Sequence, residues 1–432
     1  MTRLDREAYN PALVRHPDSV LPNTSNATPA DMRPMRILML APEPFFEPRG
    51  TPFSEYHRIK VLVELGHHVD LVTYPFGADV DLPNLRIIRA GRPPFLSGVR
   101  IGPSAGKLVL DLYLAVTALR QARRQRYDAV HSHEEAGLLG VWLARRLGIP
   151  HLYDMHSSLP QQLTNFRFAR SRLLRKAFEV MEDRTIFGSD VVITICQDLH
   201  DHVQALGAGE RSVLIENVMG GDVEEPPQLT SRGVRDRWGI PPDAPLVLYT
   251  GTFEHYQGLD LLFDAMGRVA VARPATRLLV VGGRPEQVEA ARAHASRAGA
   301  PATFTGYQPA RDIPAYVAAA DLLASPRTSG TNTPLKIYSY LRAGKPIVAT
   351  DLLTHRQVLD EEIALLAAPN PDAFAKAIGR MLDDHALRER LGRAAAARAE
   401  SRYSRAAYVA RTRGAFERLA AASRALPADA RS

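Results

Sequence analysis

The sequence predicts an α/β protein built from two doubly wound parallel sheets, and three observations lead to this prediction. Short apolar runs alternate with segments of helical spacing from Arg36 to Cys196, and a second cycle of the same kind starts at Leu246. Parallel strands need helical crossovers that cover both faces of a sheet, which produces this alternation. The length of 432 residues suggests two or three domains of ~100–200 residues each.

The first cycle opens with an apolar strand at 36–41, which leads through a loop rich in Pro and Gly into a helix at 54–66. Further strands are expected at 69–73, 85–89, 129–131, 150–155 and 190–196, with helices at 108–124, 137–147 and 167–187. These elements define an N-terminal domain at 35–220. Residues 1–34 lack hydrophobic periodicity and are expected to form a flexible extension.

The periodicity lapses around Gly220 to Pro241, which predicts a linker at 221–244. The second cycle then defines a C-terminal domain at 245–404. Its expected strands are 246–250, 277–281, 302–305 and 321–324, and its expected helices are 259–272, 285–298 and a long stretch at 372–400. Residues 405–432 should form a last helix, with 406–422 as its core, and a tail; this helix could pack back on the N-terminal domain.

Composition excludes several classes of protein. Hydrophobic residues make up 45% and charged residues 23%, a globular balance. The single cysteine, Cys196, allows neither an intramolecular disulfide nor a cysteine-based metal site. The net charge is +7, with basic clusters at Arg120–Arg126 and Arg167–Lys176 that could face phosphates, a membrane surface or only solvent. No RNA-binding pattern or zinc finger accompanies them, so nucleic acid is not an expected partner.

No uninterrupted run of about 18 apolar residues occurs, and the segment up to Met35 lacks an apolar signal core. We therefore expect a cytoplasmic protein, and contact with the inner membrane surface stays open.

Ligands of doubly wound sheets bind outside the carboxyl ends of the strands, so the loops at those ends are the informative ones. After the first strand, Gly50 would let a backbone approach an anion closely. The later cluster His131-Ser132-His133-Glu134 faintly resembles a metal site, but no further ligand can be identified, and a hydrogen-bonded strand end is the better interpretation. We expect no metal. His156, at another strand end, could donate to a hydroxyl or stabilise charge.

In the second half, the loop from Ala324 to Lys336 gives the sharper signal. It gathers hydroxyls, amides, a helix start and a cation, a set that suits a diphosphate. The alternative is an ordinary capped helix with a solvated lysine. Neither a Walker motif nor Gly-x-Gly-x-x-Gly after the first strand is present, so ATP hydrolysis and standard NAD binding are not expected, and no cofactor is predicted.

Taken together, these segments resemble a glycosyltransferase of the two-Rossmann (GT-B) type, in the large retaining family often called family 4, over about Arg36 to Ala422. The segments that carry the resemblance keep the family's order: Gly50-Thr51, Leu62 to Val69, Asp128 to His133, His156, Ile215-Glu216-Asn217-Val218, Gly251 to Gly258, Gly306-Tyr307, Pro334-Leu335-Lys336 and Gly344 to Thr350.

The resemblance implies two Rossmann-like domains that face each other across a cleft, with a nucleotide-sugar donor on the second and an acceptor on the first. It implies His156 as the catalytic histidine and places His133 and Glu134 on the acceptor side. It also implies retention of configuration without a metal. The residues assigned to the donor are Gly50, Thr51, Gly251, Thr252, Gln257, Arg284, Tyr307, Thr333, Pro334, Leu335, Lys336 and Ser339.

The sequence departs from the family pattern in the donor motif. Thr252 stands where the family has an arginine, Gln257 where it has a lysine, and Ser339 where it has the second glutamate of Glu-x7-Glu; the first glutamate falls near Thr331. Losing two cations forfeits charge-assisted hydrogen bonds of roughly 1.5–3 kcal/mol each. The cations available as substitutes are Arg49, Arg284, Arg327 and Lys336.

The predicted function is transfer of a sugar from a nucleotide-sugar to a hydroxyl of a glycan or lipid-linked acceptor, in envelope or polysaccharide assembly. Two alternatives remain at this point. One is a non-catalytic partner protein that binds sugar nucleotides, and the other is a nucleotide-sugar epimerase of the same fold.

Overall fold

The computed structural model describes residues 33–46, 50–94, 96, 98, 105–160, 172–216 and 228–425. Most of the expected extension at 1–34 lies outside the described residues, as do Arg49, Asn217, Val218 and the start of the basic cluster at 167–176.

The first sheet contains seven strands, all parallel to their neighbours. Their spatial order is β3 (Leu85–Arg89), β2 (His68–Thr73), β1 (Arg36–Ala41), β4 (Ala129–His133), β5 (His151–Met155), β6 (Val191–Thr194) and β7 (Ser212–Leu214). The helices of this half are α1 (Gly50–Glu64), α2 (Ala105–Arg124), α3 (Gly137–Leu147), α5 (Arg172–Gly188) and α6 (Gln197–Ala205).

The second sheet contains six parallel strands. Their spatial order is β10 (Ala302–Gly306), β9 (Arg277–Val281), β8 (Leu246–Thr250), β11 (Leu322–Ser325), β12 (Ile347–Thr350) and β13 (Leu365–Ala367). Its helices are α7 (Ser231–Arg237), α8 (Leu259–Ala272), α9 (Pro285–Arg297), α10 (Ile313–Ala319), α11 (Lys336–Arg342), α12 (Leu353–Arg356), α13 (Pro371–Asp383) and α14 (His385–Arg402).

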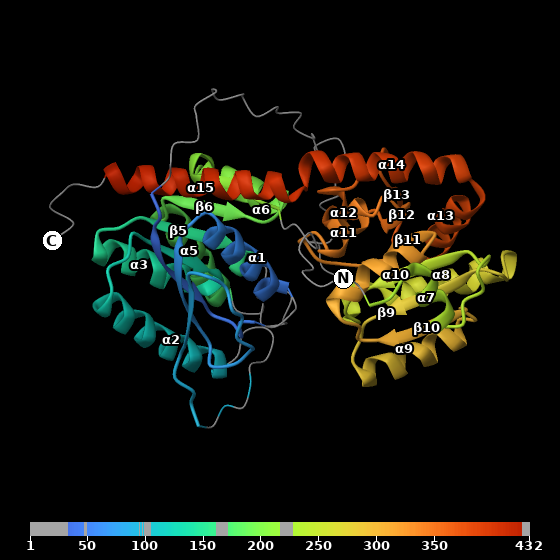
Figure 1. The fold of residues 1–432 in the computed structure, drawn as a ribbon, viewed down its shortest axis with the longest axis horizontal. Coiled ribbons are helices and arrows are strands. Elements are labelled where there is room, and N and C mark those ends of the chain that lie inside the picture. Colours follow the sequence, from blue (N-terminus) through green and yellow to red (C-terminus); the bar gives the residue numbers. More distant parts are fainter. Residues whose placement is uncertain are drawn as a thin grey trace. The chain divides into compact units, whose positions relative to one another are not determined.

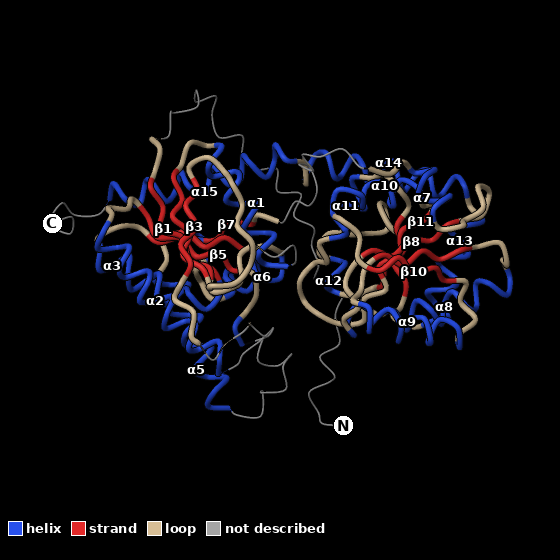
Figure 2. Tube along the Cα trace, turned by 60° about the horizontal axis from the view of Figure 1, so that its bottom comes forward, coloured by secondary structure: helices blue, strands red, loops and turns tan. Residues whose placement is uncertain are grey.

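In both halves helices cover a central parallel sheet, as Figure 2 shows with the strands in red and the helices in blue. The predicted fold class is therefore confirmed. Inner strands such as β1 and β8 are apolar runs buried on both faces, whereas the edge strands β3 and β10 are only partly buried.

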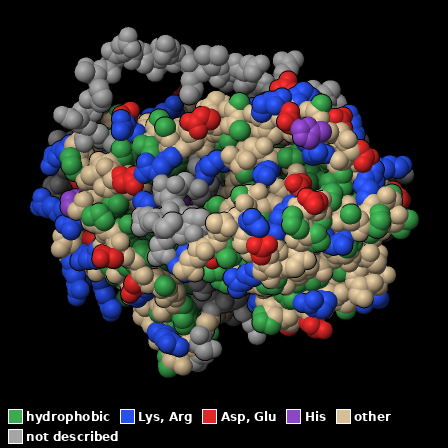
Figure 3. All heavy atoms as spheres, turned by 45° about the vertical axis from the view of Figure 1, so that its right-hand side comes forward, with side chains coloured by type: hydrophobic (Ala, Val, Ile, Leu, Met, Phe, Trp, Pro, Cys, Tyr) green, Lys and Arg blue, Asp and Glu red, His purple; other side chains and the backbone are tan. Residues whose placement is uncertain are grey.

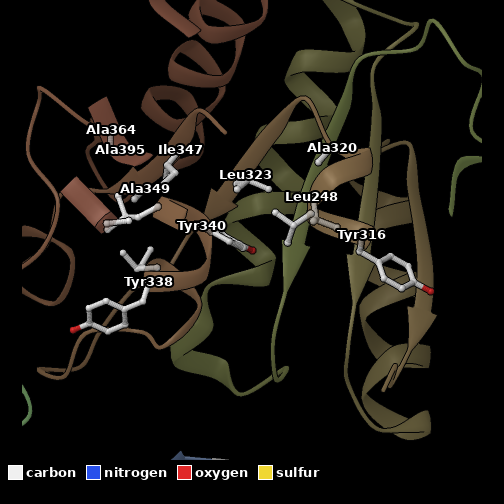
Figure 4. Close-up of a cluster of buried hydrophobic side chains, with 14 of the residues drawn as sticks. Leu248, Tyr316, Ala320, Leu323, Tyr338, Tyr340, Ile347, Ala349, Ala364 and Ala395 are labelled. Carbon is white, nitrogen blue, oxygen red and sulfur yellow. The ribbon is translucent and has the colours of Figure 1, made fainter. Parts of the chain in front are cut away.

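The core of the second half illustrates how side chains alternate across a buried sheet. Leu246 and Leu248 pack into one cluster with Tyr338 and Tyr340 of α11, whereas Val247 and Tyr249 pack into the cluster on the opposite face. Figure 4 shows the first cluster, where the two tyrosines lie close to the β12 side chains Ile347 and Ala349. Because α11 is held by this packing, the loop before it is fixed at the carboxyl edge of the sheet.

Two segments differ from their sequence-based prediction. Residues 228–244, expected as linker, contain α7, which Thr230 caps and whose Val234 is fully buried in the second core. The helical stretch expected at 372–400 breaks at Asp384, whose backbone is extended and whose side chain accepts a hydrogen bond from the Leu387 amide. A capping carboxylate inside an Ala-rich and Arg-rich run thus starts a new helix.

The last helix, α15 (Arg405–Ala425), packs against α1, β6 and β7 of the first half, and Figure 1 shows it in red along that half. The ring of Phe416 lies 5.6 Å from that of His67 and 5.9 Å from that of His131. No helix in the described part of the chain combines the length and apolar character needed to cross a membrane. On the face drawn in Figure 3, basic and acidic side chains are interspersed.

A substitution at Gly267 in α8 shows how tightly this helix packs against its neighbours. Ala is favoured over Gly in a helix by about 1 kcal/mol, but a Cβ at Gly267 would lie 1.9 Å from the backbone oxygen of Ala298. We therefore expect Gly267→Ala to destabilise the protein by about 1–3 kcal/mol in urea unfolding.

The matched control is Gly414→Ala in α15, where a Cβ would meet nothing within 4 Å. This change should stabilise the protein by about 0.5–1 kcal/mol. Equal effects of the two substitutions would contradict the packing of α8 described above.

Candidate functional site

The carboxyl ends of β4 and β5 bring five polar side chains together in the interior of the first half. His131 and His133 come from β4, Asp154 from β5, His156 from the turn after it, and Arg58 from α1; each is 0–3% exposed. The Nδ1 atom of His133 lies 3.1 Å from Nε2 of His156, and the rings of His131 and His133 stack at 4.6 Å. Adjacent parallel strands produce this grouping, since their carboxyl ends share one edge of the sheet.

A buried ion pair lies at the centre of this cluster. Arg58 Nε donates to Asp154 Oδ2 at 3.1 Å, and its NH1 donates to Thr412 Oγ1 of α15 at 2.9 Å. The Arg58 guanidinium also lies 4.9 Å from the ring centre of Tyr408. Burial opposes the charge of Asp154, but Arg58 and the neighbouring imidazoles hold the pKa of this carboxyl well below its usual value.

His156 is a neutral imidazole at neutral pH. Burial lowers its pKa to about 4, although the Asp154 carboxylate, 3.4 Å from Nε2, favours the charged form. A neutral ring can donate one hydrogen bond and accept another. His156 is therefore equipped to orient a hydroxyl and not to act as a cation.

His131, His133 and Asp154 each offer an atom within 4.8 Å of the others, a spacing at which three ligands could hold a metal ion. Burial lowers the pKa of both histidines, which leaves them neutral as metal ligands must be. Arg58, however, already donates to Asp154 at 3.1 Å, so a divalent cation here would lie beside a buried guanidinium. The chemistry of this cluster fits an ion pair with hydrogen-bonded imidazoles better than a metal centre.

Two carboxyl groups border the cluster. Glu134, at a φ of +46°, accepts a hydrogen bond from Ser157 Oγ at 2.9 Å, and burial beside Glu135 raises its pKa to about 8. Glu55 of α1 is fully buried with Oε1 3.4 Å from His133 Nδ1, and burial next to Glu43 raises its pKa well above the usual value. The predicted acceptor-side residues His133 and Glu134 thus lie in the same cluster as His156.

The loops that follow β8 and β9 in the second sheet contact each other through glycines. Gly251 after β8 and Gly282 after β9 have φ values of 142° and 120°, and a Cβ on Gly282 would lie 2.0 Å from the oxygen of Gly251. Only glycine permits this approach of two backbones. The amide of Gly251 donates to Val281 and that of Gly282 to Gly306, so both amides are already engaged.

Lys336 lies next to Gly251. Its Nζ is shielded from solvent and has no hydrogen-bond partner among the described residues. It lies 3.7 Å from the ring centre of Tyr249 and would be 3.1 Å from a Cβ on Gly251. Burial, with a further contribution from the charge of Arg327, lowers the pKa of Lys336 well below its usual value. The Lys336 amine is thus buried with no negatively charged partner among the described residues.

The second cation, Arg327, is held by the loop itself. Its Nε donates to the Ser329 oxygen at 2.8 Å and its NH1 to the Asn332 oxygen at 2.9 Å, while the guanidinium lies 4.9 Å from the centre of the Tyr256 ring. These partners are neutral, so Arg327 of the loop and Lys336 at the start of α11 lie close together without a carboxylate paired to either among the described residues.

The remaining predicted donor residues differ in exposure. Arg284 pairs with Glu286 at 2.8 Å and lies 3.6 Å from Glu254, so its charge is already matched. Thr252 and Tyr307 are exposed, the latter by 69%, while Thr333 is buried. The other predicted positions lie at element boundaries or are half-buried: Gly50 and Thr51 open α1, Gln257 precedes α8, Pro334 and Leu335 precede α11, and Ser339 lies within α11.

Sequence reasoning missed Arg58, Glu55 and Asp154 as members of the site. Asp154 could have been noticed as a carboxylate inside an apolar strand, where an unpaired charge is costly. The sequence did not single out Arg58 and Glu55, because charged residues are common on a helix that is expected to be exposed.

The fold and these two strand-end sites define a protein of the GT-B class, with paired α/β domains. Residues 57–217 match the family described as "Glycosyl transferase 4-like domain", and residues 232–398 match "Glycosyl transferases group 1". The chain belongs to this glycosyltransferase family and is an enzyme of that kind.

Two relatives of known name span most of the chain. It is 28% identical over 337 residues to a D-inositol 3-phosphate glycosyltransferase of Xylanimonas cellulosilytica, covering 74% of this chain and 78% of the relative. It is 29% identical over 375 residues to a phosphatidyl-myo-inositol mannosyltransferase of Mycobacterium leprae, covering 85% and 93%.

Solved structures share the fold. A sucrose-phosphate synthase from Thermosynechococcus elongatus superposes with a TM-score of 0.72 at 22% identity, covering 90% of this chain and 99% of that one. Anabaena Alr3699/HepE in complex with UDP and glucose gives a TM-score of 0.67 at 18% identity, covering 89% and 99%.

The Arg58–Asp154 ion pair gives a stability test. Arg58→Met removes one partner and leaves a buried carboxylate, which should cost about 3–5 kcal/mol in urea unfolding. Adding Asp154→Asn should recover part of that loss, because the double variant buries no unpaired charge. Arg232→Met, at a side chain 92% exposed, is the control and should change little. A loss below about 0.5 kcal/mol in Arg58→Met would contradict the ion pair.

Proposed function

We propose that this enzyme transfers a sugar from a nucleotide-sugar donor to a hydroxyl of a glycan or lipid-linked acceptor, with retention of configuration and without a metal or cofactor. The observation that carries the proposal is the buried amine of Lys336, which lies beside the Gly251 backbone and has no hydrogen-bond partner among the described residues. A buried cation without a carboxylate partner is costly unless the ligand brings the negative charge. A diphosphate brings that charge.

Sugar transfer breaks the bond between the anomeric carbon and the diphosphate oxygen, and negative charge builds up on the departing oxygen. Lys336 and Arg327 would stabilise this charge from the second domain. The acceptor hydroxyl forms the new bond to the anomeric carbon on the face from which the diphosphate leaves, and its proton passes to the departing phosphate. Neutral His156 would orient a hydroxyl of the donor sugar through a hydrogen bond.

The relatives support this assignment. The names of the two curated relatives give inositol 3-phosphate and phosphatidyl-myo-inositol as their substrates, and the Anabaena protein was solved in complex with UDP and glucose. Cationic groups at Lys336 and Arg327 take over the role of the arginine and lysine that Thr252 and Gln257 replace.

Turnover tests the proposal. The purified protein is incubated with UDP-sugars and GDP-sugars and with acceptors that carry free hydroxyls, and the released nucleoside diphosphate is measured. Sugar transfer supports the proposal. An isomerised donor would indicate an epimerase, and nucleotide binding without turnover a partner protein.

Lys336→Met should weaken nucleoside diphosphate binding by about tenfold to a hundredfold, the equivalent of one charge-assisted contact. In the wild type, a bound diphosphate would favour the ammonium form of an amine whose pKa is lowered in the free protein. Binding therefore takes up a proton, and affinity should fall as pH rises through the range between the lowered pKa and ~10.4. Calorimetry of UDP and GDP binding across this range measures both effects.

The control is Lys376→Met, which removes an exposed lysine of α13 in the same half. It should leave the affinity and its pH dependence unchanged. If Lys336→Met behaves like this control, Lys336 does not contact the diphosphate.

We further propose that the protein acts on the cytoplasmic side of a membrane and that α2 touches the lipid surface. Leu108, Leu112 and Val116 repeat every four residues along one side of this helix and are exposed by 72%, 63% and 38%. Arg120, Arg123 and Arg124 follow in the same helix and are exposed. Apolar side chains beside basic ones are the composition of helices that lie on anionic membranes.

Replacing Leu108 and Leu112 together by Ser should reduce co-sedimentation with vesicles that contain phosphatidylglycerol by about tenfold, since two exposed apolar side chains lose their lipid contact. Binding of the wild type should decline with salt. Val271→Ser, which alters a side chain 87% exposed in the other half, is the control and should leave binding unchanged. Equal binding of all three proteins would refute the contact.

A further inference from the structure

Two side-chain amides connect the donor loop, defined as residues 326–335 between β11 and α11, to the carboxyl edge of the first sheet. Asn332 Nδ2 donates to the backbone oxygen of His156 at 2.8 Å. Gln357 accepts from the Asp198 amide at 2.8 Å and donates to the Thr331 oxygen at 2.6 Å. Both bridges therefore join the donor loop, or the helix beside it, to the residues that follow β5 and β6.

The partners of these amides fix their orientation. His156 and Thr331 contribute carbonyl oxygens, which only accept, and Asp198 contributes an N–H, which only donates. The Oδ1 atom of Asn332 lies 3.8 Å from the Cys196 thiol, a weak donor. Each amide therefore has a hydrogen-bond acceptor at its nitrogen and a donor at its oxygen.

The backbone of Asn332 is also held in place. Its carbonyl oxygen accepts from Arg327 NH1 at 2.9 Å and from Thr354 Oγ1 at 2.7 Å. Arg327 thus contacts the same residue that reaches His156, while Lys336 follows Asn332 by four residues. The positions of the two cations and of the His156 carbonyl depend on one short segment.

We propose that Asn332 is a positioning residue, which sets the place of His156 relative to a donor held at Lys336 and Arg327. This inference rests on the proposed function. In an enzyme that transfers a sugar, the distance between the diphosphate and the group that orients the sugar must be kept to a fraction of an ångström. Asn332 ties the two together through one hydrogen bond to the backbone of His156 itself.

Two variants test the role of the Asn332 amide. Asn332→Ala removes the hydrogen bond, and Asn332→Asp keeps the shape but places a carboxylate oxygen against the His156 carbonyl. With the donor found in the turnover screen, kcat should fall about tenfold for Ala and further for Asp, whereas the affinity for UDP or GDP and the KM for donor should stay within about twofold. A loss confined to KM would overturn the positioning role.

Hydrogen exchange supplies a readout that needs no turnover. In the nucleotide-free protein, amides of residues 155–159 should exchange about fivefold faster or more in both variants than in the wild type. The control is Asn370→Ala, which deletes a similar amide hydrogen bond, to Ala373 at the start of α13, away from the first sheet. Exchange at 155–159 that matches this control would overturn the proposal, whereas absent turnover in the wild type would count against the proposed function alone.

Discussion

The arrangement of the first half depends on the ion pair between Arg58 and Asp154. A carboxylate at the end of a central strand is nearly cut off from water, and Arg58 is the cation that compensates it. The same guanidinium donates to Thr412 and lies against Tyr408, so the pair also anchors α15. Burial keeps His156 neutral, and the charge of Arg58 lowers the pKa of its imidazole further. The Arg58–Asp154 pair therefore anchors the C-terminal helix and contributes to the neutral state of His156.

The cationic side chains of the second half are arranged differently from Arg58. Lys336 and Arg327 lie close together, and among the described residues neither pairs with a carboxylate and the groups that accept hydrogen bonds from Arg327 are neutral. The buried carboxylate of the first half thus has a cation beside it, whereas Lys336 and Arg327 of the second half have no carboxylate partner among the described residues. That difference supports the proposed assignment, in which a diphosphate binds at the edge that carries Lys336 and Arg327.

The fold could be predicted from the sequence because each apolar strand can be recognised independently of the others, as in 246–250 and 277–281. Elements of only three residues, such as β7 and β13, gave no comparable signal. In the site, residues in the loops after strands or at the helix start that follows such a loop, such as His156 and Lys336, could be singled out one at a time. Arg58 and Glu55 could not, since their importance arises from burial against Asp154 and His133, which are 96 and 78 residues away in the sequence and which only the tertiary structure brings near.

The replacements in the donor motif also make physical sense together. By the family resemblance, Thr252 and Gln257 stand where two cations are expected on the loop after β8, whereas Arg327 lies in the donor loop and Lys336 is the first residue of α11. The donor loop also reaches the first half, because Asn332 donates to the backbone oxygen of His156. Under the proposed function, one short segment would therefore influence both leaving-group stabilisation and the orientation of the sugar. A shift of that segment would disturb both, so the packing of α11 on the second core matters for chemistry as well as for stability.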